Sequence, residues 1–300
     1  MSLLIQVEEE IPRNPNYLIW QDSVAVTQFL TTRYVPLRLG TNLQLFAQGK
    51  VSTYMFKSDI IRADFTFDSI GTRAISSVAQ YLFYEGSGNI LHDLSGNGND
   101  GTINNGTWGM LPNGKYYLHF DGSSTYVSLP TPLIPNPTAV IAEALFRVEK
   151  LNSFQIIYRQ GCCGEHNIDI SNTNNIEFAV KLSDQNWYVA SSASASITAQ
   201  TGQWYHAVGV WVRGKYVRLY LNGQKVAEVT VPDLPLYDPG SAFKCALGAF
   251  IVGTSASSYF GGDIACVRVF NDKILRIVPS IDDLVTCLYN LAKVMVPDLP

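Results

Sequence analysis

Apolar and polar residues alternate with the two-residue period of a β-strand along most of this chain. The clearest run is WYHAVGVWVR, residues 204–213, in which both alternating sets are largely apolar. A strand that is apolar on both faces belongs inside a two-layer structure, so this run is predicted to be a core strand. Further runs of the same kind cover residues 116–120, 125–129, 139–148, 154–159, 176–182, 186–190 and 243–250.

The segment KYVRLYLNGQKVAEVTV, residues 215–231, contains Asn222-Gly223 between two alternating runs. This dipeptide is the strongest short-range signal of a β-hairpin, and a two-residue turn would place Leu219 opposite Val226. The other predicted strands are separated by glycine, asparagine and serine. Regular short strands with such turns predict an all-β, antiparallel two-sheet jelly-roll sandwich.

The two ends of the chain differ from this central pattern. Prolines interrupt the first part, which then reads as a hairpin around Gln48-Gly49 followed by an alternating run at 60–67. We therefore expect residues 1–77 to form a separate β-rich module for anchoring or assembly.

Residues 279–295, PSIDDLVTCLYNLAKVM, begin with proline and serine, carry two aspartates in the first turn and have one apolar stripe. This pattern predicts an amphipathic helix. The predicted organisation is thus a module at 1–77, a jelly-roll domain at 78–278, and a short helix and tail at 279–300.

Composition narrows the classes of partner. A formal charge of −4, a pI near 5.6 and the lack of any lysine or arginine cluster argue against nucleic-acid binding. No segment approaches the roughly 18 apolar residues of a membrane span, and the first residues do not resemble a secretory signal. An aromatic share of 12% with only 15% charged residues favours a protein exposed outside the cell or packed in an assembly.

Five cysteines are present, without the CxxC spacing of a zinc site. Most free cysteines in proteins are buried, so these are predicted to be buried thiols. The pair to test first for a disulfide is Cys245 with Cys266.

Four segments of the chain share the features of one known family. They are AQYLFYEGSGNILHDLSGNGNDGTINNGTW (79–108), YYLHFDGSSTYVSLP (116–130), GQWYHAVGVWVRGKYVRLYLNGQKVAE (202–228) and FGGDIACVRVFNDKIL (260–275). In this order they resemble the LamG-like, concanavalin A-like lectin/glucanase jelly roll. The resemblance spans residues 78–290, and the N-terminal module lies outside it. It implies that the DLSGNGNDG stretch is a surface loop across one end of the sandwich, often beside a bound calcium ion.

Calcium would need six to eight oxygen ligands, and Asp93 and Asp100 of this loop, together with Asp121, are the positions that could provide carboxylates. Asp93 and Asp121 could equally cap turns, because aspartate bonds readily to its own backbone. The family often has Ile-Asp in its last strand, where this chain has Ile264-Ala265. Asp263 points to the same face as residue 265 and is the substitute we expect.

Hydrolysis of glycans on this fold would need two carboxyl groups about 5–10 Å apart. The acidic residues available do not form the closely spaced pattern of the family's glucanases, and GxSxG, HExxH and phosphate-binding loops are also missing from the sequence. The chain is therefore predicted not to be an enzyme. The acidic residues considered are Glu143, Glu165, Asp169, Glu177 and Asp184.

A sugar-binding surface would carry exposed aromatic rings, because sugars stack their C–H faces on rings. Trp204 and Trp211 lie in the most apolar run and are predicted to be core residues. For each remaining candidate, core packing or subunit contact is an alternative. These candidates are Trp108, Trp187, Tyr188, Tyr237 and Tyr259.

Together these features predict a non-enzymatic structural and recognition protein at a virion surface, as a capsid-associated, spike or fibre component. Its expected partners are other structural subunits, either copies of itself or capsid proteins, and host-cell glycans used for attachment. One alternative is an extracellular carbohydrate-binding adhesin. A second alternative is a glycoside hydrolase.

Overall fold

The computed structural model describes residues 77–276, 278 and 280–300, together with four short strands nearer the N-terminus. Those strands form two antiparallel pairs, β1 (Tyr17–Trp20) with β2 (Arg33–Pro36) and β3 (Phe46–Ala47) with β4 (Lys50–Val51). The β3–β4 pair confirms the hairpin expected around residues 48 and 49. The strand expected at 60–67 lies outside the described residues.

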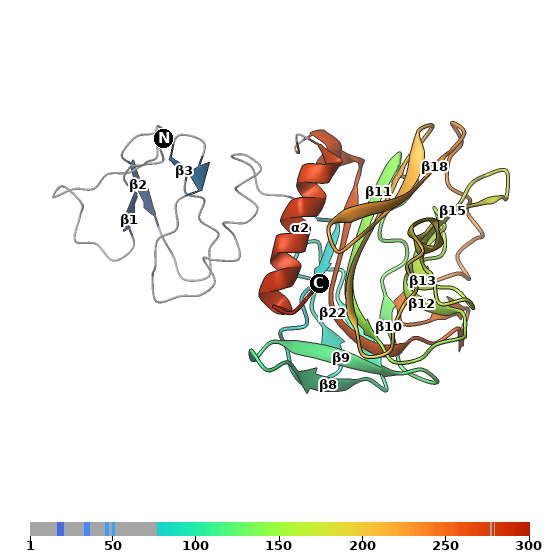
Figure 1. Ribbon diagram of the computed structural model, residues 1–300, viewed down its shortest axis with the longest axis horizontal. Helices are drawn as coiled ribbons and strands as arrows, with labels where there is room; N and C mark the ends of the chain where they lie inside the picture. The colour runs from blue at the N-terminus through green and yellow to red at the C-terminus, as the bar shows by residue number, and fades with distance from the viewer. Residues whose placement is uncertain are drawn as a thin grey trace. The chain divides into compact units, whose positions relative to one another are not determined.

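Two eight-stranded antiparallel sheets face one another, which confirms the jelly-roll sandwich (Figure 1). The first sheet has the strand order β15-β14-β13-β12-β19-β10-β7-β6. Its strands are β6 (Ile90–Leu91), β7 (Gly101–Asn104), β10 (Tyr126–Leu129), β12 (Gln155–Gln160), β13 (His166–Ile170), β14 (Ile176–Lys181), β15 (Trp187–Ser191) and β19 (Cys245–Leu247).

The second sheet has the order β18-β17-β16-β11-β22-β9-β8, and β5 also pairs with β22. Its strands are β5 (Ala79–Tyr81), β8 (Thr107–Met110), β9 (Tyr116–Asp121), β11 (Ala139–Val148), β16 (Trp204–Val212), β17 (Tyr216–Leu221), β18 (Gln224–Thr230) and β22 (Gly261–Asn271). The remaining elements are the hairpin β20 (Phe250–Val252) and β21 (Ser255–Ser257), the 3-10 turns η1 (Ser192–Ala195) and η2 (Asp272–Arg276), and helix α2 (Ile281–Met295).

The inner faces of the two sheets meet in one hydrophobic core. Trp211 of β16 is fully buried there, as its place in the most apolar run predicted. A methyl group added at Gly209 would lie 2.1 Å from the ring of Phe178 on the opposite sheet. Glycine at this position therefore allows the two sheets to approach closely.

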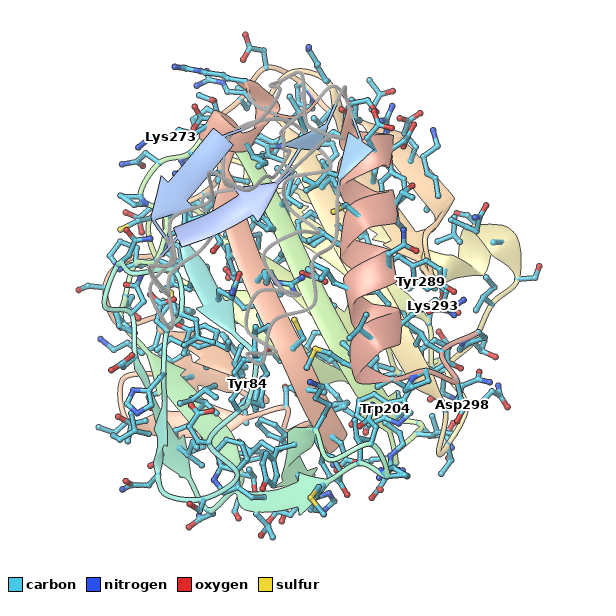
Figure 2. All side chains as sticks on the ribbon, turned by 90° about the vertical axis from the view of Figure 1, so that its left-hand side faces the viewer. Tyr84, Trp204, Lys273, Tyr289, Lys293 and Asp298 are labelled. Carbon is cyan, nitrogen blue, oxygen red and sulfur yellow. The ribbon has the colours of Figure 1, made fainter. Side chains whose placement is uncertain are left out.

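The predicted helix is confirmed as α2. Its C-terminal half lies on the outer face of the second sheet, where Ala292 and Met295 share a small apolar cluster with Leu145 and Cys266 (Figure 1). In Figure 2, Tyr289 and Lys293 lie on this helix, and the Lys293 ammonium is 5.0 Å from the centre of the Tyr289 ring.

The hairpin predicted at Asn222-Gly223 is confirmed, with both residues at positive φ. Its predicted register is wrong beyond the first two pairs, because Leu219 lies opposite Ala227 and not Val226. A β-bulge between Leu219 and Tyr220 in the pairing inserts one extra residue into β18.

Among the described residues, no helix is long and apolar enough to cross a membrane.

Candidate functional site

The outer face of the first sheet carries a group of polar side chains on or beside β12, β13 and β14, and most of them are buried. On β13, Ile168 and Ile170 point into the core. The alternate residues, Asn167 and Asp169, therefore point outward. The cross-strand pairs are Arg159 with Asn167, and Asp169 with Glu177. We call this set the polar face; its members are Arg159, Glu165, Asn167, Asp169, Glu177 and Lys181.

Arg159 is the centre of the polar face. Its guanidinium forms an ion pair with Glu165, donates a 3.1 Å hydrogen bond to the Asn167 amide oxygen, and lies 4.3 Å from the Phe250 ring centre. Burial raises the pKa of the Glu165 carboxyl, and the charge of Arg159 offsets part of that increase. The β20–β21 hairpin that supplies Phe250 thus shields this ion pair from water.

Asp169 is 1% exposed and has an incomplete set of partners. One carboxyl oxygen accepts a hydrogen bond from the Asn167 amide, but the other has no partner among the described residues. Burial, and next the charge of Glu177, raise the pKa of Asp169 well above its ordinary value. Burial also raises the pKa of Glu177, whose carboxylate accepts a 3.2 Å hydrogen bond from the Ser191 hydroxyl. Asp169 and Glu177 are therefore neighbours on this face, both with an increased preference for the neutral form.

At one end of the polar face, two aromatic rings flank Lys181. The Lys181 ammonium is 4.6 Å from the centre of the Tyr237 ring and 5.7 Å from the Trp187 ring. Lys181 and Trp187 are directly opposite one another on β14 and β15, and the Tyr237 N–H donates to the Lys181 carbonyl at 2.8 Å. Trp187 is 43% exposed. We call Lys181, Trp187 and Tyr237 the aromatic rim.

The other three predicted aromatic residues lie elsewhere. Tyr188 points to the opposite face of β15, and its hydroxyl donates to Asp184 at 2.9 Å. Tyr259 packs near Tyr126 over β19. Trp108 packs against the core, 6.2 Å from the Phe83 ring, and donates its indole N–H to the Gly88 carbonyl. The structure therefore brings together two of the five candidates, Trp187 and Tyr237.

Asp93 organises the glycine-rich loop that was expected beside calcium. Its carboxylate accepts hydrogen bonds from the backbone N–H groups of Gln80, Ser95 and Asn99, each 2.9 Å long. Asp100 accepts a 2.7 Å bond from the Asp93 N–H. The loop ends where β7 begins at Gly101, and residues 107–110 form β8.

Asp121 likewise caps its own turn. One of its carboxylate oxygens accepts from the backbone N–H groups of Ser123, Ser124 and Thr125, and the other from the two serine hydroxyls. These bonds hold the pKa of Asp121 well below its ordinary value, although burial acts in the opposite direction. The capping alternative therefore describes the contacts of this side chain.

Asp263 forms an ion pair with Arg147. Its carboxylate receives Arg147 at 2.5 Å and 2.7 Å, and it lies 2.9 Å from Nδ1 of His119. The guanidinium of Arg147 is also 5.5 Å from the centre of the Trp204 ring. Asp263 therefore joins β22 to β9 and β11 through side-chain contacts.

The four aspartates are not gathered into one set of possible metal ligands. Among the described residues, the groups of three possible metal ligands are Cys162 with Cys163 and Asp238, and His119 with Glu149 and Asp263. Asp93, Asp100 and Asp121 belong to neither group. Calcium takes six to eight oxygens, whereas these carboxylates accept hydrogen bonds within their own turns or pair with Arg147.

The other acidic candidates differ in their surroundings. Glu143 is buried and paired with Arg268 and His206 on the outer side of the second sheet, away from the polar face. Asp184 is exposed and caps the β14–β15 turn through the Asn186 N–H. The sequence did not indicate that Asp169 and Glu177 would meet, because they are adjacent only through the pairing of β13 and β14.

Cys245 and Cys266, the pair chosen to test first for a disulfide, are not bonded to one another. All five cysteines are free thiols, and Cys245 lies in the core between the sheets. Cys266 lies in the cluster beneath helix α2, on the far side of the second sheet. Because the two side chains occupy opposite faces of that sheet, they cannot reach one another.

Several solved structures share this fold. The binding domain of Paraclostridial Mosquitocidal Protein 1 aligns with a TM-score of 0.55 at 10% identity, covering 72% of this chain and 52% of that one. The binding domains of botulinum neurotoxin serotypes G and D align with TM-scores of 0.53 and 0.52 at 13% and 15% identity. These alignments cover 72% and 75% of this chain and 51% and 52% of the toxin chains. The chain thus spans about half the length of these structures.

No curated protein matches the sequence significantly. A family model does match, over residues 121–275, and it describes the concanavalin A-like lectin/glucanases superfamily. That segment contains β10 to β22, including every strand of the polar face. The chain belongs to the concanavalin A-like lectin/glucanases superfamily.

Proposed function

We propose that this chain is a non-catalytic, lectin-like recognition domain that binds a glycan at the aromatic rim. The observation that carries the proposal is the exposed Trp187 ring, which shares the Lys181 side chain with Tyr237. Sugars stack their C–H faces on such rings, and charged and amide groups nearby bind their hydroxyls. Asp184 and Asn186, in the adjoining turn, are exposed groups of this type.

Hydrolysis is the second candidate, and the Asp169–Glu177 pair favours it. Glycosidases use two carboxyl groups, one of which is kept protonated by its surroundings. Both residues have a raised pKa, but Asp169 is almost completely buried and so is poorly placed to reach a sugar. We therefore propose binding as the function and treat turnover as an outcome of the binding experiment.

Replacing Trp187 with alanine is expected to weaken glycan binding at least tenfold, because the exposed stacking surface is lost. A glycan array would identify a ligand for the full chain, and calorimetry would compare the variants. Phe154→Ala is the matched control, since Phe154 is 41% exposed just before β12, at the opposite end of the strands from Trp187.

Equal affinity of the Trp187→Ala and Phe154→Ala variants would contradict binding at the rim. The absence of any retained glycan would contradict the lectin function itself. Mass spectrometry of the glycan after incubation with the protein distinguishes hydrolysis from binding. If shorter saccharides form with the parent protein and do not form with Glu177→Gln, the function is hydrolysis and not binding alone.

We further propose that the domain is a surface component of a virus particle and attaches it to host glycans, together with copies of itself or capsid proteins. The low share of charged residues and the 16 tyrosines support a protein packed in an assembly. The expected result is copurification with virions at fixed stoichiometry through a density gradient. Recovery in the particle-free medium or on cell surfaces would instead support the adhesin.

A further inference from the structure

The turn between β12 and β13 contains two adjacent cysteines, in the sequence Gly161-Cys162-Cys163-Gly164. Cys163 has a φ of 62°, in the left-handed region that non-glycine residues rarely adopt. In this conformation the two sulfur atoms are 3.1 Å apart. Consecutive side chains in an extended strand point to opposite faces, so the turn is what brings these thiols together.

Three other segments hold the turn in place. The Cys162 N–H donates to the Phe243 carbonyl at 3.1 Å, and the Cys163 carbonyl accepts from Asn136 at 2.9 Å. The Cys163 N–H donates to the Asp238 carboxylate at 2.8 Å. A methyl group added at Gly161 would lie 2.6 Å from the Phe243 backbone, so the neighbouring chain fits closely here. The positive φ is thus fixed by hydrogen bonds on both sides of the turn.

We propose that Cys162 and Cys163 are a reversible redox site, which forms a disulfide between adjacent residues by exchange with a small-molecule disulfide. A disulfide bond is about 2.05 Å long, so the sulfurs need to approach by only about 1 Å. Cys245 and Cys266 do not have this geometry, because they are buried in separate clusters.

Oxidised glutathione serves as the oxidant in the following sequence. Cys163 is the more exposed of the pair, and its thiolate attacks one glutathione sulfur, which forms a mixed disulfide and releases one glutathione thiolate. Cys162 then loses its proton to solvent and attacks the Cys163 sulfur, which forms the Cys162–Cys163 bond and releases the second glutathione. Two thiols are oxidised and one glutathione disulfide is reduced to two thiols.

The order of attack follows from the surroundings of the two thiols. Burial, and next the hydrogen bond with Cys163, raise the pKa of Cys162 to about 12. Because the thiolate is the nucleophile, Cys162 is a poor first attacker of an external disulfide. Once Cys163 carries glutathione, the nearby Cys162 sulfur reacts within the molecule, where proximity compensates for its low thiolate fraction.

The experiment uses the full chain, incubated with oxidised glutathione, unfolded at low pH, alkylated and mapped by mass spectrometry. We expect three alkylated cysteines in place of the five found without oxidant, and a peptide containing Cys162 and Cys163 that is lighter by two hydrogens. Dithiothreitol should restore all five. The Cys162→Ser variant should stop at the mixed disulfide and retain glutathione on Cys163.

Cys266→Ala is the control and should still lose two hydrogens from the same peptide. Five alkylated cysteines at every glutathione concentration would overturn the proposal, as would a bridge to any other cysteine. Because the readout is a mass, the result is independent of whether the aromatic rim binds a glycan.

Discussion

Replacing Glu143 with alanine is expected to lower the free energy of unfolding by about 3–5 kcal/mol, because it breaks a buried ion pair. The Glu143 carboxylate is 1% exposed and receives Arg268 at 2.6 Å and 2.9 Å. Nε2 of His206 lies 2.9 Å from the same carboxylate. Three neighbouring strands, β11, β22 and β16, therefore share one buried polar group.

The contribution of this group should depend on pH with a definite sign. Burial alone would raise the pKa of Glu143, but Arg268 and His206 outweigh it and hold the pKa below the ordinary value of 4.5. A depressed pKa stabilises the fold above the unfolded pKa, and that stability is lost as the pH falls from 4.5 through the folded pKa. The difference between the two proteins should therefore shrink in acid.

Urea denaturation at pH 7 and at pH 3–4 measures both effects. The control is Glu228→Ala, which removes a surface ion pair with Arg218 on the same sheet and is expected to cost less than about 1 kcal/mol. A double replacement of Glu143 and Arg268 by methionine should recover most of the loss, because apolar pairs of similar volume replace buried ion pairs well. Equal losses in Glu143→Ala and Glu228→Ala would contradict this assignment.

Asp169→Asn is expected to stabilise the protein at alkaline pH, by as much as about 3 kcal/mol, the cost of a buried polar group without its partner. The native carboxyl has one oxygen without a partner and lies beside Glu177. Its pKa is raised well above 3.8, so ionising it in the folded state is unfavourable. The unfolded chain loses this proton first, and stability therefore falls as the pH rises from about 3.8 through the folded pKa.

The measurement is the unfolding free energy of both proteins from pH 4 to pH 9. Their curves should meet in acid, where Asp169 is protonated, and separate as the pH rises. Asp184→Asn is the control, because the pKa of Asp184 is lowered by its bonds to the Asn186 backbone and side chain and its charge is constant over this range. Parallel curves for Asp169→Asn and the parent protein would contradict the raised pKa.

The alternating pattern was sufficient to predict the sandwich, because each core strand turns every second residue toward the opposite sheet, whatever its partners are. It predicted β11 and β16 to within a residue, and the helix from its acidic first turn and apolar stripe. The pairing register of the strands was harder to predict from the sequence. The bulge opposite Leu219 depends on how β18 packs, and the local sequence around Asn222-Gly223 does not encode it.

For the candidate site too, the local sequence predicted a single residue but not which residues come together. Trp187 was identifiable because it begins a strand after a polar turn, where a large ring has little to bury against. Trp108 has a similar local sequence, but Phe83, 25 positions earlier, packs against it. The polar face was missed as a unit because Arg159, Asp169 and Glu177 come from three different strands, and only pairing brings them together.

The free edges of the two sheets limit how this domain can join its neighbours. The strands β6 and β8 at one pair of edges have only two and four residues, and β18 carries the charged pair Lys225 and Glu228. Short or charged edges are poor templates for backbone pairing with a second chain. At these three edges a neighbouring chain would be held by side-chain contacts, and added salt would weaken those contacts that are charged.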